Sequence, residues 1–154
     1  MKNIAVIGTG VIGTGWILRF LANGIKVKAF DKNSQQLNFL KDEITRTNLI
    51  IKKLYNTKIN FKNLEIVDNI EEAVKNADLI QENVPERLSL KKDVIKNISK
   101  YSPSNSIIAS SSSGLLPTRI YSKCKNPERG IIGHPFNPVY LLPAVEIVPG
   151  KKTL

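Results

Sequence analysis

Cysteine is almost missing from this sequence, which carries a single thiol at Cys124. One cysteine permits no disulfide within the chain, a composition that suits a reducing compartment, and we expect a cytoplasmic protein. Cys124 could be a nucleophile or a redox thiol. Its place between Lys123 and Lys125 favours instead a half-exposed loop thiol without a chemical role.

Long hydrophobic runs are also missing. Two stretches have no formally charged residue, Tyr101–Thr118 and Gly130–Val145, but the first is crowded with serine and the second holds three prolines. Neither is therefore expected to span a membrane. No internal repeat or low-complexity linker divides the 154 residues, a length that suits one domain with a hydrophobic core.

Acidic residues are the minority among the charges. The 13 Asp and Glu stand against 23 Lys and Arg, which gives a formal net charge of +10. The lysines are spread along the chain and accompany no nucleic-acid reading motif, so nucleic-acid binding is only a minor hypothesis. A positive field could still attract an anionic cofactor or an acyl-CoA. No metal site and no membrane partner are predicted.

The first thirty-one residues carry the strongest pattern. A short apolar strand is expected over residues Lys2–Ile7, followed at once by the G-x-G-x-x-G formed by Gly8, Gly10 and Gly13. A helical stretch, a stop at residues 23–24 and a second strand over Ile25–Phe30 come next. Asp31 closes that second strand, so the structural context that the motif requires is present in order.

Each of these residues suits the binding of a dinucleotide. Gly8 allows the tight strand-to-helix turn, Gly10 lets the backbone approach a pyrophosphate, and Gly13 lets the helix pack closely on the strand. The free N–H groups at the helix N-terminus then receive negative charge. Asp31 is placed to accept hydrogen bonds from the adenosine ribose, which favours NAD over NADP, although the neighbouring Lys32 leaves NADP open.

The rest of the chain alternates helices with short apolar runs. Helices are expected from a Ser34 cap with an apolar stripe of Leu37, Leu40, Ile44, Ile51 and Leu54, from an Asp68–Glu71 capping box through Lys75, and from Pro85 with Leu90, Val94, Ile95 and Ile98 buried. Strands are expected at Leu64–Val67, Ala77–Gln81, Ser106–Ala109 and Ile131–Ile132, a last apolar run at Ala144–Val148, and a polar loop at Asn56–Asn63. The alternation predicts an α/β fold with a doubly wound parallel sheet of the Rossmann type.

Polar residues follow several of the expected strands. Glu82 and Asn83 follow one, the serines of Ser110–Ser113 follow another, and His134 follows Ile131–Ile132. Ligands of this fold bind beyond the carboxyl ends of the strands. His134, the only histidine, could be a turn residue before a proline or a group that transfers protons near neutral pH. Glu146, in the last apolar run, is either outward-facing on an edge strand or paired, and pairing would orient His134.

Two longer segments resemble a known family. The segment Gly133–Glu146, which reads GHPFNPVYLLPAVE, resembles the signature of the 3-hydroxyacyl-CoA dehydrogenase superfamily. Together with Ser110–Thr118, its H-P-F-N-P form looks most like the L-carnitine dehydrogenase branch, whereas the hydroxyacyl-CoA enzymes tend to show H-F-F-N-P and the L-gulonate branch H-P-x-N-P. The resemblance extends from Gly8 to Glu146.

The resemblance implies a reaction and roles for particular residues. By position, His134 matches the catalytic base, Glu146 its partner and Ser113 the serine that binds the substrate hydroxyl. Glu82 corresponds to an acid on the nicotinamide side of an NAD site, and Asn137 to a structural asparagine. The implied activity is NAD-dependent oxidation of a secondary 3-hydroxyl group, with carnitine (giving 3-dehydrocarnitine) ahead of a sugar acid and an acyl-CoA.

Members of the superfamily also have a second, helical domain that closes the substrate site and forms a dimer, and this sequence contains no counterpart. We expect residues 1–154 to be the NAD-binding domain alone, with residues 151–154 as the start of a linker or a truncated end. The protein would then be weak or inactive without a helical domain, which could be a separate chain, and a homodimer is expected only with it. A non-catalytic NAD-binding module is the alternative of another class.

Overall fold

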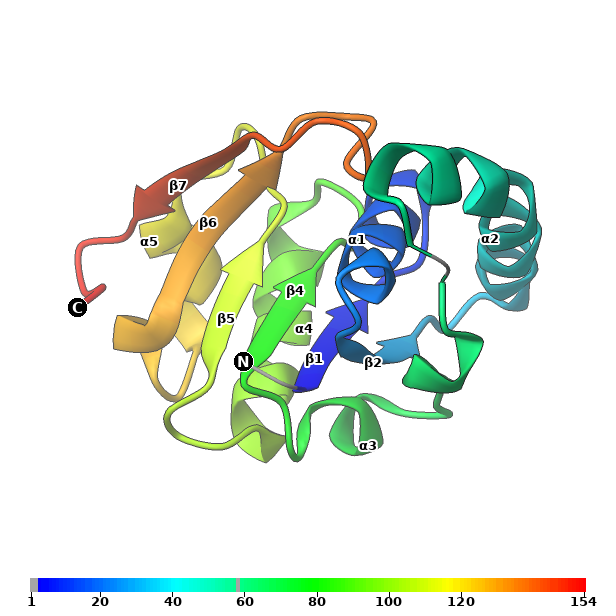
Figure 1. The fold of residues 1–154 in the computed structure, drawn as a ribbon. Helices are drawn as coiled ribbons and strands as arrows, with labels where there is room; N and C mark the ends of the chain where they lie inside the picture. The colour runs from blue at the N-terminus through cyan, green and yellow to red at the C-terminus, as the bar shows by residue number, and fades with distance from the viewer. Residues whose placement is uncertain (1–2, 58) are drawn as a thin grey trace.

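The computed structural model describes residues 3–57 and 59–154 as a seven-stranded sheet in the order β3-β2-β1-β4-β5-β6-β7 (Figure 1). The strands are β1 (Asn3–Ile7), β2 (Lys26–Phe30), β3 (Leu64–Ile66), β4 (Leu79–Glu82), β5 (Ile107–Ser110), β6 (Gly130–Pro135) and β7 (Val145–Pro149). β1 to β6 are parallel, which confirms the doubly wound α/β prediction. β7 is antiparallel to β6, because the chain reverses in the segment 136–144 and needs no crossover helix.

Helices cover both faces of the sheet. They are α1 (Val11–Ala22), α2 (Ser34–Tyr55), α3 (Ile70–Val74), α4 (Leu88–Tyr101) and α5 (Pro117–Ile120), with three single 3₁₀ turns, η1 (Phe61–Asn63), η2 (Tyr121–Lys123) and η3 (Pro127–Arg129). The reversal of strand order lies between β1 and β4, where β2 extends the sheet to one side and β5 to the other. Ligands bind at such a reversal in open α/β sheets.

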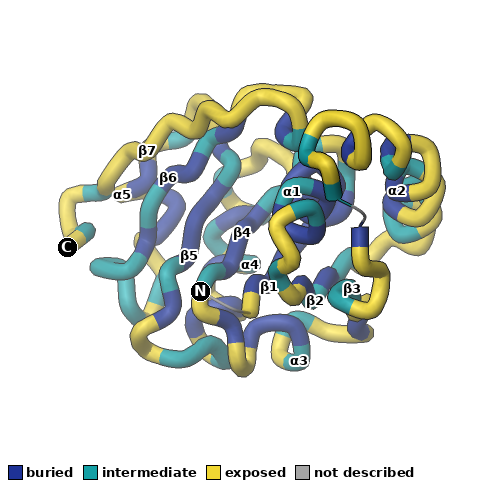
Figure 2. Tube along the Cα trace, viewed as in Figure 1, coloured by how far each residue is buried: buried dark blue, intermediate teal, exposed yellow. Residues whose placement is uncertain are grey.

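Two apolar cores lie on opposite faces of the sheet because successive strand side chains alternate in direction. Ile4 and Val6 of β1 pack with α1 and α2, whereas Ala5 and Ile7 pack with α3, α4 and α5. Figure 2 shows the central strands as buried and β7 as exposed along its length. The apolar strands expected at the centre of the sheet, now β1, β4 and β5, are therefore confirmed as strands buried on both sides, whereas the edge strands β3 and β7 are largely exposed.

Three helix starts differ from the sequence-based expectation. The cap of α2 is Asn33 rather than Ser34, since the Asn33 side chain accepts a hydrogen bond from the Gln35 N–H at 3.0 Å. The cap of α3 is Asn69 rather than Asp68, and it accepts from Glu72 N–H at 2.8 Å. Asparagine is as good a cap as either residue that was expected, so composition alone could not choose between neighbours.

Helix α4 begins at Leu88, three residues after the expected start at Pro85. Pro85 instead belongs to a loop, and its carbonyl accepts a hydrogen bond from Arg87 N–H. The stripe of α2 also ends earlier than expected, because Leu54 is exposed. The polar loop at 56–63 ends in the turn η1. Lys2 of the expected first strand and Lys58 of that loop lie outside the described residues.

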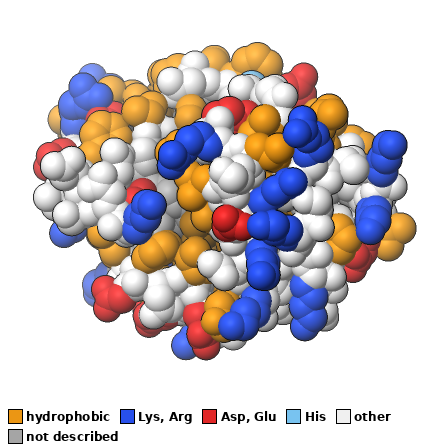
Figure 3. All heavy atoms as spheres, turned by 180° about the vertical axis from the view of Figure 1, so that it is seen from behind, with side chains coloured by type: hydrophobic (Ala, Val, Ile, Leu, Met, Phe, Trp, Pro, Cys, Tyr) orange, Lys and Arg blue, Asp and Glu red, His pale blue; other side chains and the backbone are white. Residues whose placement is uncertain are grey.

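The surface carries charges of both signs. Figure 3, the face opposite to Figure 1, shows Lys and Arg side chains gathered in a band with acidic side chains beside it. Exposed pairs such as Lys123–Asp93 (2.8 Å) and Lys28–Glu65 (3.2 Å) offset part of the positive charge. Across residues 3–57 and 59–154, every helix is too short or too polar to cross a membrane.

A buried ion pair supports the carboxyl edge of the sheet. Glu82, at the end of β4, and Lys91, on α4, are 0% and 1% exposed. Lys91 Nζ lies 2.8 and 3.1 Å from the two Glu82 carboxylate oxygens and also donates to the Val84 carbonyl. Glu82 in turn accepts hydrogen bonds from Val84 N–H and the Ser110 hydroxyl. The pair fixes the loop that follows β4 to helix α4.

We predict that Lys91→Met lowers the free energy of unfolding by about 3–5 kcal/mol, because it leaves the Glu82 carboxylate buried without its counter-charge. Lys91→Met with Glu82→Gln should recover most of that loss. Urea denaturation measures both, and Lys92→Met, at a half-buried neighbouring position, should change stability by no more than about 0.5 kcal/mol. Equal losses for Lys91→Met and Lys92→Met would contradict a special role for the pair.

Candidate functional site

A cleft of about 530 Å³ lies at the carboxyl ends of β1, β2 and β4. Its lining includes Gly8, Gly10, Asp31 and Asn83, and its apolar wall is formed by Phe30, Ile70, Val84, Leu90 and Val94. We call it the glycine cleft. Its position beside the β1–β4 reversal is the one expected for a nucleotide in this fold.

The glycines of the cleft fit a dinucleotide. Gly8 has φ +90°, and a side chain there would meet the Asn83 backbone at 2.9 Å. A Cβ at Gly13 would lie 1.9 Å from the Gly8 carbonyl oxygen, so the helix can approach the strand only without one. Gly10 is the N-cap of α1, and the first turn carries neither a capping side chain nor an acidic residue. The positive end of α1 is therefore open to an anion.

Asp31 lines the same cleft. Its Oδ2 accepts hydrogen bonds from Thr9 N–H at 2.7 Å and from the Thr9 hydroxyl at 3.3 Å, and its Oδ1 accepts from Asn33 N–H at 2.9 Å. Asp31 thus ties the glycine turn to the end of β2. A carboxylate has four acceptor positions, so two protein contacts on Oδ2 and one on Oδ1 still leave capacity for ribose hydroxyls.

A second cavity of about 370 Å³ adjoins the glycine cleft. The two share Asn83, Val84 and Pro85, and the second is also lined by Ile12, Glu86, Lys91, Ser111, Ser113, His134 and Pro135. We call it the histidine cavity. His134 and the glycine turn therefore open at the same mouth of the sheet.

His134 lies on β6 directly opposite Glu146 on β7. Its Nδ1 is buried and 3.4 Å from Glu146 Oε2, although the two are not aligned for a hydrogen bond. The Glu146 side chain is 60% exposed, so Glu146 is both outward-facing on an edge strand and close to the imidazole. With Nδ1 directed at Glu146, Nε2 is the ring nitrogen available for chemistry in the cavity.

The four consecutive serines after β5 have different environments. Three of them donate their hydroxyls to protein acceptors: Ser110 to Glu82 Oε2, Ser111 to Asn83 Oδ1 and Ser112 to Glu86 Oε1. Ser113 is exposed, lines the histidine cavity, and donates its hydroxyl to no acceptor within the described part of the chain. Among the four, Ser113 therefore has the hydroxyl that is available to a ligand.

Glu82 lies elsewhere than the sequence suggested. Its carboxylate is completely buried in the ion pair with Lys91 and lines neither the glycine cleft nor the histidine cavity. In this geometry Glu82 supports the site from within, and a direct contact between Glu82 and a cofactor is not available. The carboxylate is buried because it pairs with Lys91 on α4, nine residues later in the sequence. The sequence alone did not indicate this pair.

Glu86 is the acid that faces the histidine cavity, and sequence reasoning missed it. Its Oε1 accepts hydrogen bonds from the Ser112 hydroxyl and from the N–H groups of Ser113 and Gly114. Burial alone would raise the pKa of Glu86, but these bonds and the charge of Lys91 outweigh it, so the pKa lies below its ordinary value. Glu86 is consequently a carboxylate at neutral pH. The only sequence signal was its place in the loop between Asn83 and α4.

The segment 136–144, which follows His134, is held against α1 and α2. Val139 is buried against Gly15, where a Cβ would lie 2.9 Å from the Val139 Cβ. The Tyr55 hydroxyl donates to the Tyr140 carbonyl and accepts from Arg19. Asn137, expected to be structural, is exposed in this segment. The helix that begins at the glycine turn thus also supports the segment after His134.

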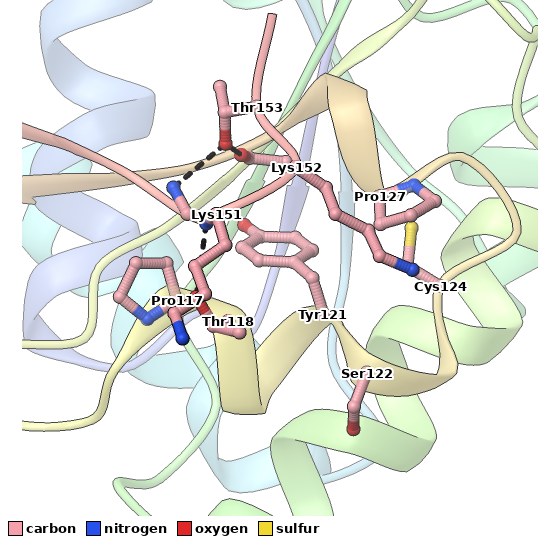
Figure 4. Close-up of a pocket in the computed structure, with 11 residues that line it drawn as sticks. Pro117, Thr118, Tyr121, Ser122, Cys124, Pro127, Lys151, Lys152 and Thr153 are labelled. Carbon is pink, nitrogen blue, oxygen red and sulfur yellow. Dashed lines mark hydrogen bonds between the residues drawn. The ribbon is translucent and has the colours of Figure 1, made fainter.

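A separate cavity of about 270 Å³ holds the single cysteine (Figure 4). Cys124, Tyr121 and Pro127 line one side of it, and Lys151, Lys152 and Thr153 another. Burial raises the pKa of the Cys124 thiol, which disfavours the reactive thiolate. The structure therefore favours the reading of Cys124 as an unreactive, half-buried loop thiol. Among the residues described, no group of three His, Cys, Asp or Glu could hold a metal ion.

Comparison with known families matches residues 3–154 to the 3-hydroxyacyl-CoA dehydrogenase, NAD binding domain. The chain belongs to this family. The resemblance stated from the sequence and the expected NAD cofactor are confirmed at this level, and the glycine cleft is where the described residues would hold NAD.

The relatives support the same branch that the sequence indicated. The chain is 51% identical to L-carnitine dehydrogenase of Oceanobacillus iheyensis and 45% identical to that of Pseudomonas putida, with 99% of this chain aligned in each case. It covers only 50% and 48% of those proteins, so the chain spans about half the length of the curated relatives it matches.

Solved structures agree on the fold. An NAD⁺-dependent dismutase, 5-formyl-3-hydroxy-2-methylpyridine 4-carboxylic acid 5-dehydrogenase, is 30% identical with a TM-score of 0.92, over 100% of this chain and 50% of that one. The 3-hydroxybutyryl-CoA dehydrogenase of Escherichia coli K12 is 30% identical with a TM-score of 0.91, over 99% of this chain and 33% of that one.

We predict that Gly13→Ala mainly lowers the stability of the fold, whereas Gly10→Ala mainly weakens NAD binding. Gly13→Ala should destabilise the fold by about 1–3 kcal/mol or more, because its Cβ has no space. Gly10→Ala should change stability by no more than about 1 kcal/mol, since its nearest neighbour is Gln36 Oε1 at 3.6 Å, yet weaken NAD binding at least about tenfold by crowding the pyrophosphate. Denaturation and calorimetric titration with NAD measure the two effects. Unchanged NAD affinity in Gly10→Ala would contradict this placement of the cofactor.

Proposed function

We propose that this chain is the NAD-binding part of an enzyme that oxidises a secondary 3-hydroxyl group, with L-carnitine as the substrate. The observation that supports the proposal is the adjacency of two cavities: Ser113 and His134 line a space that shares the lining residues Asn83 and Pro85 with the glycine cleft. A substrate beside His134 would thus lie at the same mouth as a dinucleotide on the glycine turn. The L-carnitine dehydrogenases among the relatives favour carnitine within this class.

The residues in the histidine cavity divide the chemistry among them. Ser113 donates a hydrogen bond to the substrate oxygen and orients the alcohol. His134 Nε2 takes the hydroxyl proton as the C–O bond becomes a carbonyl, and Glu146, 3.4 Å from Nδ1, stabilises the resulting imidazolium. NAD, when bound, accepts the hydride that leaves the carbinol carbon. Proton, hydride and product ketone then account for all the atoms of the alcohol.

Phe136 offers a contact that suits carnitine, and the H-F-F-N-P form of the hydroxyacyl-CoA enzymes has phenylalanine at the same place, so this contact does not by itself distinguish the two substrates. Its ring centroid lies 5.9 Å from that of His134, and the side chain is 50% exposed. An exposed aromatic face beside the base can attract a quaternary ammonium by a cation–π contact, typically about 0.5–2 kcal/mol. The trimethylammonium of carnitine would make this contact, whereas a sugar acid or an acyl-CoA has no such group.

The active unit includes a further helical part, supplied by a longer chain or by a partner. The histidine cavity opens to solvent beside an exposed Ser113 and a 60% exposed Glu146, and proton transfer and substrate orientation benefit from exclusion of water. The relatives, of which this chain covers about half, have the length to provide such a part. A homodimer would form through that part.

We predict that His134→Gln lowers NADH production from L-carnitine by about 10²–10⁴-fold, as expected for loss of a general base. The experiment measures NADH with L-carnitine, L-gulonate and 3-hydroxybutyryl-CoA, using this chain alone and fused to the remaining half of the Oceanobacillus iheyensis enzyme. Ser104→Ala, an exposed serine in the turn before β5, is the control for serine removal and should not change the rate, whereas Ser113→Ala should reduce it.

Turnover of L-carnitine by the fusion and not by the isolated chain would support both the substrate and the need for a helical part. Turnover of another substrate in preference to L-carnitine would contradict the substrate. Tight NAD binding without turnover in either form would contradict the enzymatic proposal and favour a non-catalytic NAD-binding module.

A further inference from the structure

Gln81 is a buried amide at the centre of the sheet for which the proposed chemistry gives no role. It lies on β4, is 2% exposed, and its Nε2 donates to Ser111 Oγ at 2.8 Å and to the Gly133 carbonyl at 3.1 Å. Ser111 directly follows β5 and Gly133 lies on β6, thirty and fifty-two residues away in sequence. A buried amide that joins three strands is costly to bury without these partners.

The contact between Gln81 and the Gly133 carbonyl lies where the backbone pairing between β5 and β6 stops. The β5–β6 ladder ends at the pair Ser110↔Ile132, and the next residue, Ser111, donates its N–H to the Glu82 carbonyl instead. The Gly133 carbonyl is therefore beyond the β5–β6 ladder, and the Gln81 side chain reaches across to it. That carbonyl belongs to the planar peptide that leads into His134, so its direction sets the direction of the His134 Cα.

The contact between Gln81 and Ser111 fixes the segment Ser111–Ser113. Ser111 Oγ accepts from Gln81 and from Trp16 Nε1 (3.2 Å) and donates to Asn83 Oδ1 (2.7 Å). Its hydroxyl is thus fully engaged, and it anchors the segment that carries Ser113 two residues later. Asn83, the other end of this network, lines both the glycine cleft and the histidine cavity.

We propose that Gln81 is a positioning residue, which holds the His134 peptide and the Ser111–Ser113 segment at a fixed separation above the cofactor site. The proposal rests on the proposed function of His134 and Ser113. Gln81 does not line the histidine cavity, so it acts through the two segments that it joins. A displacement of about 1 Å between base and substrate-binding hydroxyl can reduce a rate by roughly 10²-fold.

The test replaces Gln81 by Met, which is similar in length, unbranched and adaptable in a core but donates no hydrogen bond. Because His134 is the only histidine, the ¹⁵N ring resonances report its tautomer without assignment of other signals. In the wild-type chain we expect one tautomer with the proton on Nδ1 facing Glu146. In Gln81→Met we expect a mixture of tautomers, and in the turnover assay a kcat lowered by roughly 10²-fold with the NAD Kd within about twofold.

The matched control is Ser106→Ala. Ser106 is also buried, and its hydroxyl donates to the Ala77 carbonyl at 2.7 Å, which joins the segments just before the amino ends of β5 and β4. The Ser106→Ala variant should lose about 0.5–1.5 kcal/mol of stability, with the His134 tautomer and kcat unchanged. If Gln81→Met does not fold, Ser111→Ala replaces it: this variant keeps the bond to Gly133, so kcat should fall while the tautomer stays single.

A single wild-type tautomer in Gln81→Met, with stability loss like that of Ser106→Ala, would overturn the positioning role. The tautomer is read in the isolated chain and needs no turnover. If the wild-type protein binds NAD and turns over no substrate, but Gln81→Met mixes the tautomers, the proposed function fails and the positioning of His134 stands. If the wild-type protein turns over its substrate but Gln81→Met keeps a single His134 tautomer, the proposed function stands and the positioning role of Gln81 fails.

Discussion

The approach of the end of β4 to the glycine turn is the contact on which the rest of the site depends. The Asn83 backbone lies where a side chain at Gly8 would be, and Asn83 N–H donates to the Ile7 carbonyl at 2.8 Å. Only a glycine with positive φ permits this approach. Because Asn83 is shared by the glycine cleft and the histidine cavity, the same contact joins the cleft that would hold a dinucleotide to the cavity proposed for its substrate.

Two buried polar networks keep that mouth in shape. On the face of α4, the Lys91–Glu82 pair holds the loop after β4 and the Ser110 hydroxyl. On the face of α1, Gln81, Ser111, Trp16 and Asn83 link β4, β5, β6 and the first helix. Polar groups in such positions destabilise a core when they lack partners, and here each network is satisfied largely by the backbone or side chains of the neighbouring strand ends. Buried contacts between strand ends therefore support the site.

The parts of the site that the sequence predicts are those with local causes. The glycines, Asp31 and the strand ends follow from spacing along the chain, and parallel topology then brings His134 and Ser113 to the same edge. Glu82, Glu86 and Gln81 could not be placed in this way, because their positions depend on partners nine to fifty-two residues away. A buried carboxylate and a cavity-facing one look alike in sequence. They are separated only by the position of Lys91 and by the Ser112 hydroxyl and the Ser113 and Gly114 amides, which donate to Glu86. The caps Asn33 and Asn69 were not predicted from the sequence for another reason, since neighbouring residues are almost equally good caps.

The central claim is that the imidazole and the dinucleotide share one mouth of the sheet. The direct measurement is a titration of the labelled chain with NADH, following the amide signals of Gly8 and Gly10 and the ring C–H signal of His134, which is unique in this sequence. The account predicts that all three signals move together and give the same Kd. Shifts of the glycine amides with an unmoved His134 ring would place the base away from the cofactor and contradict it.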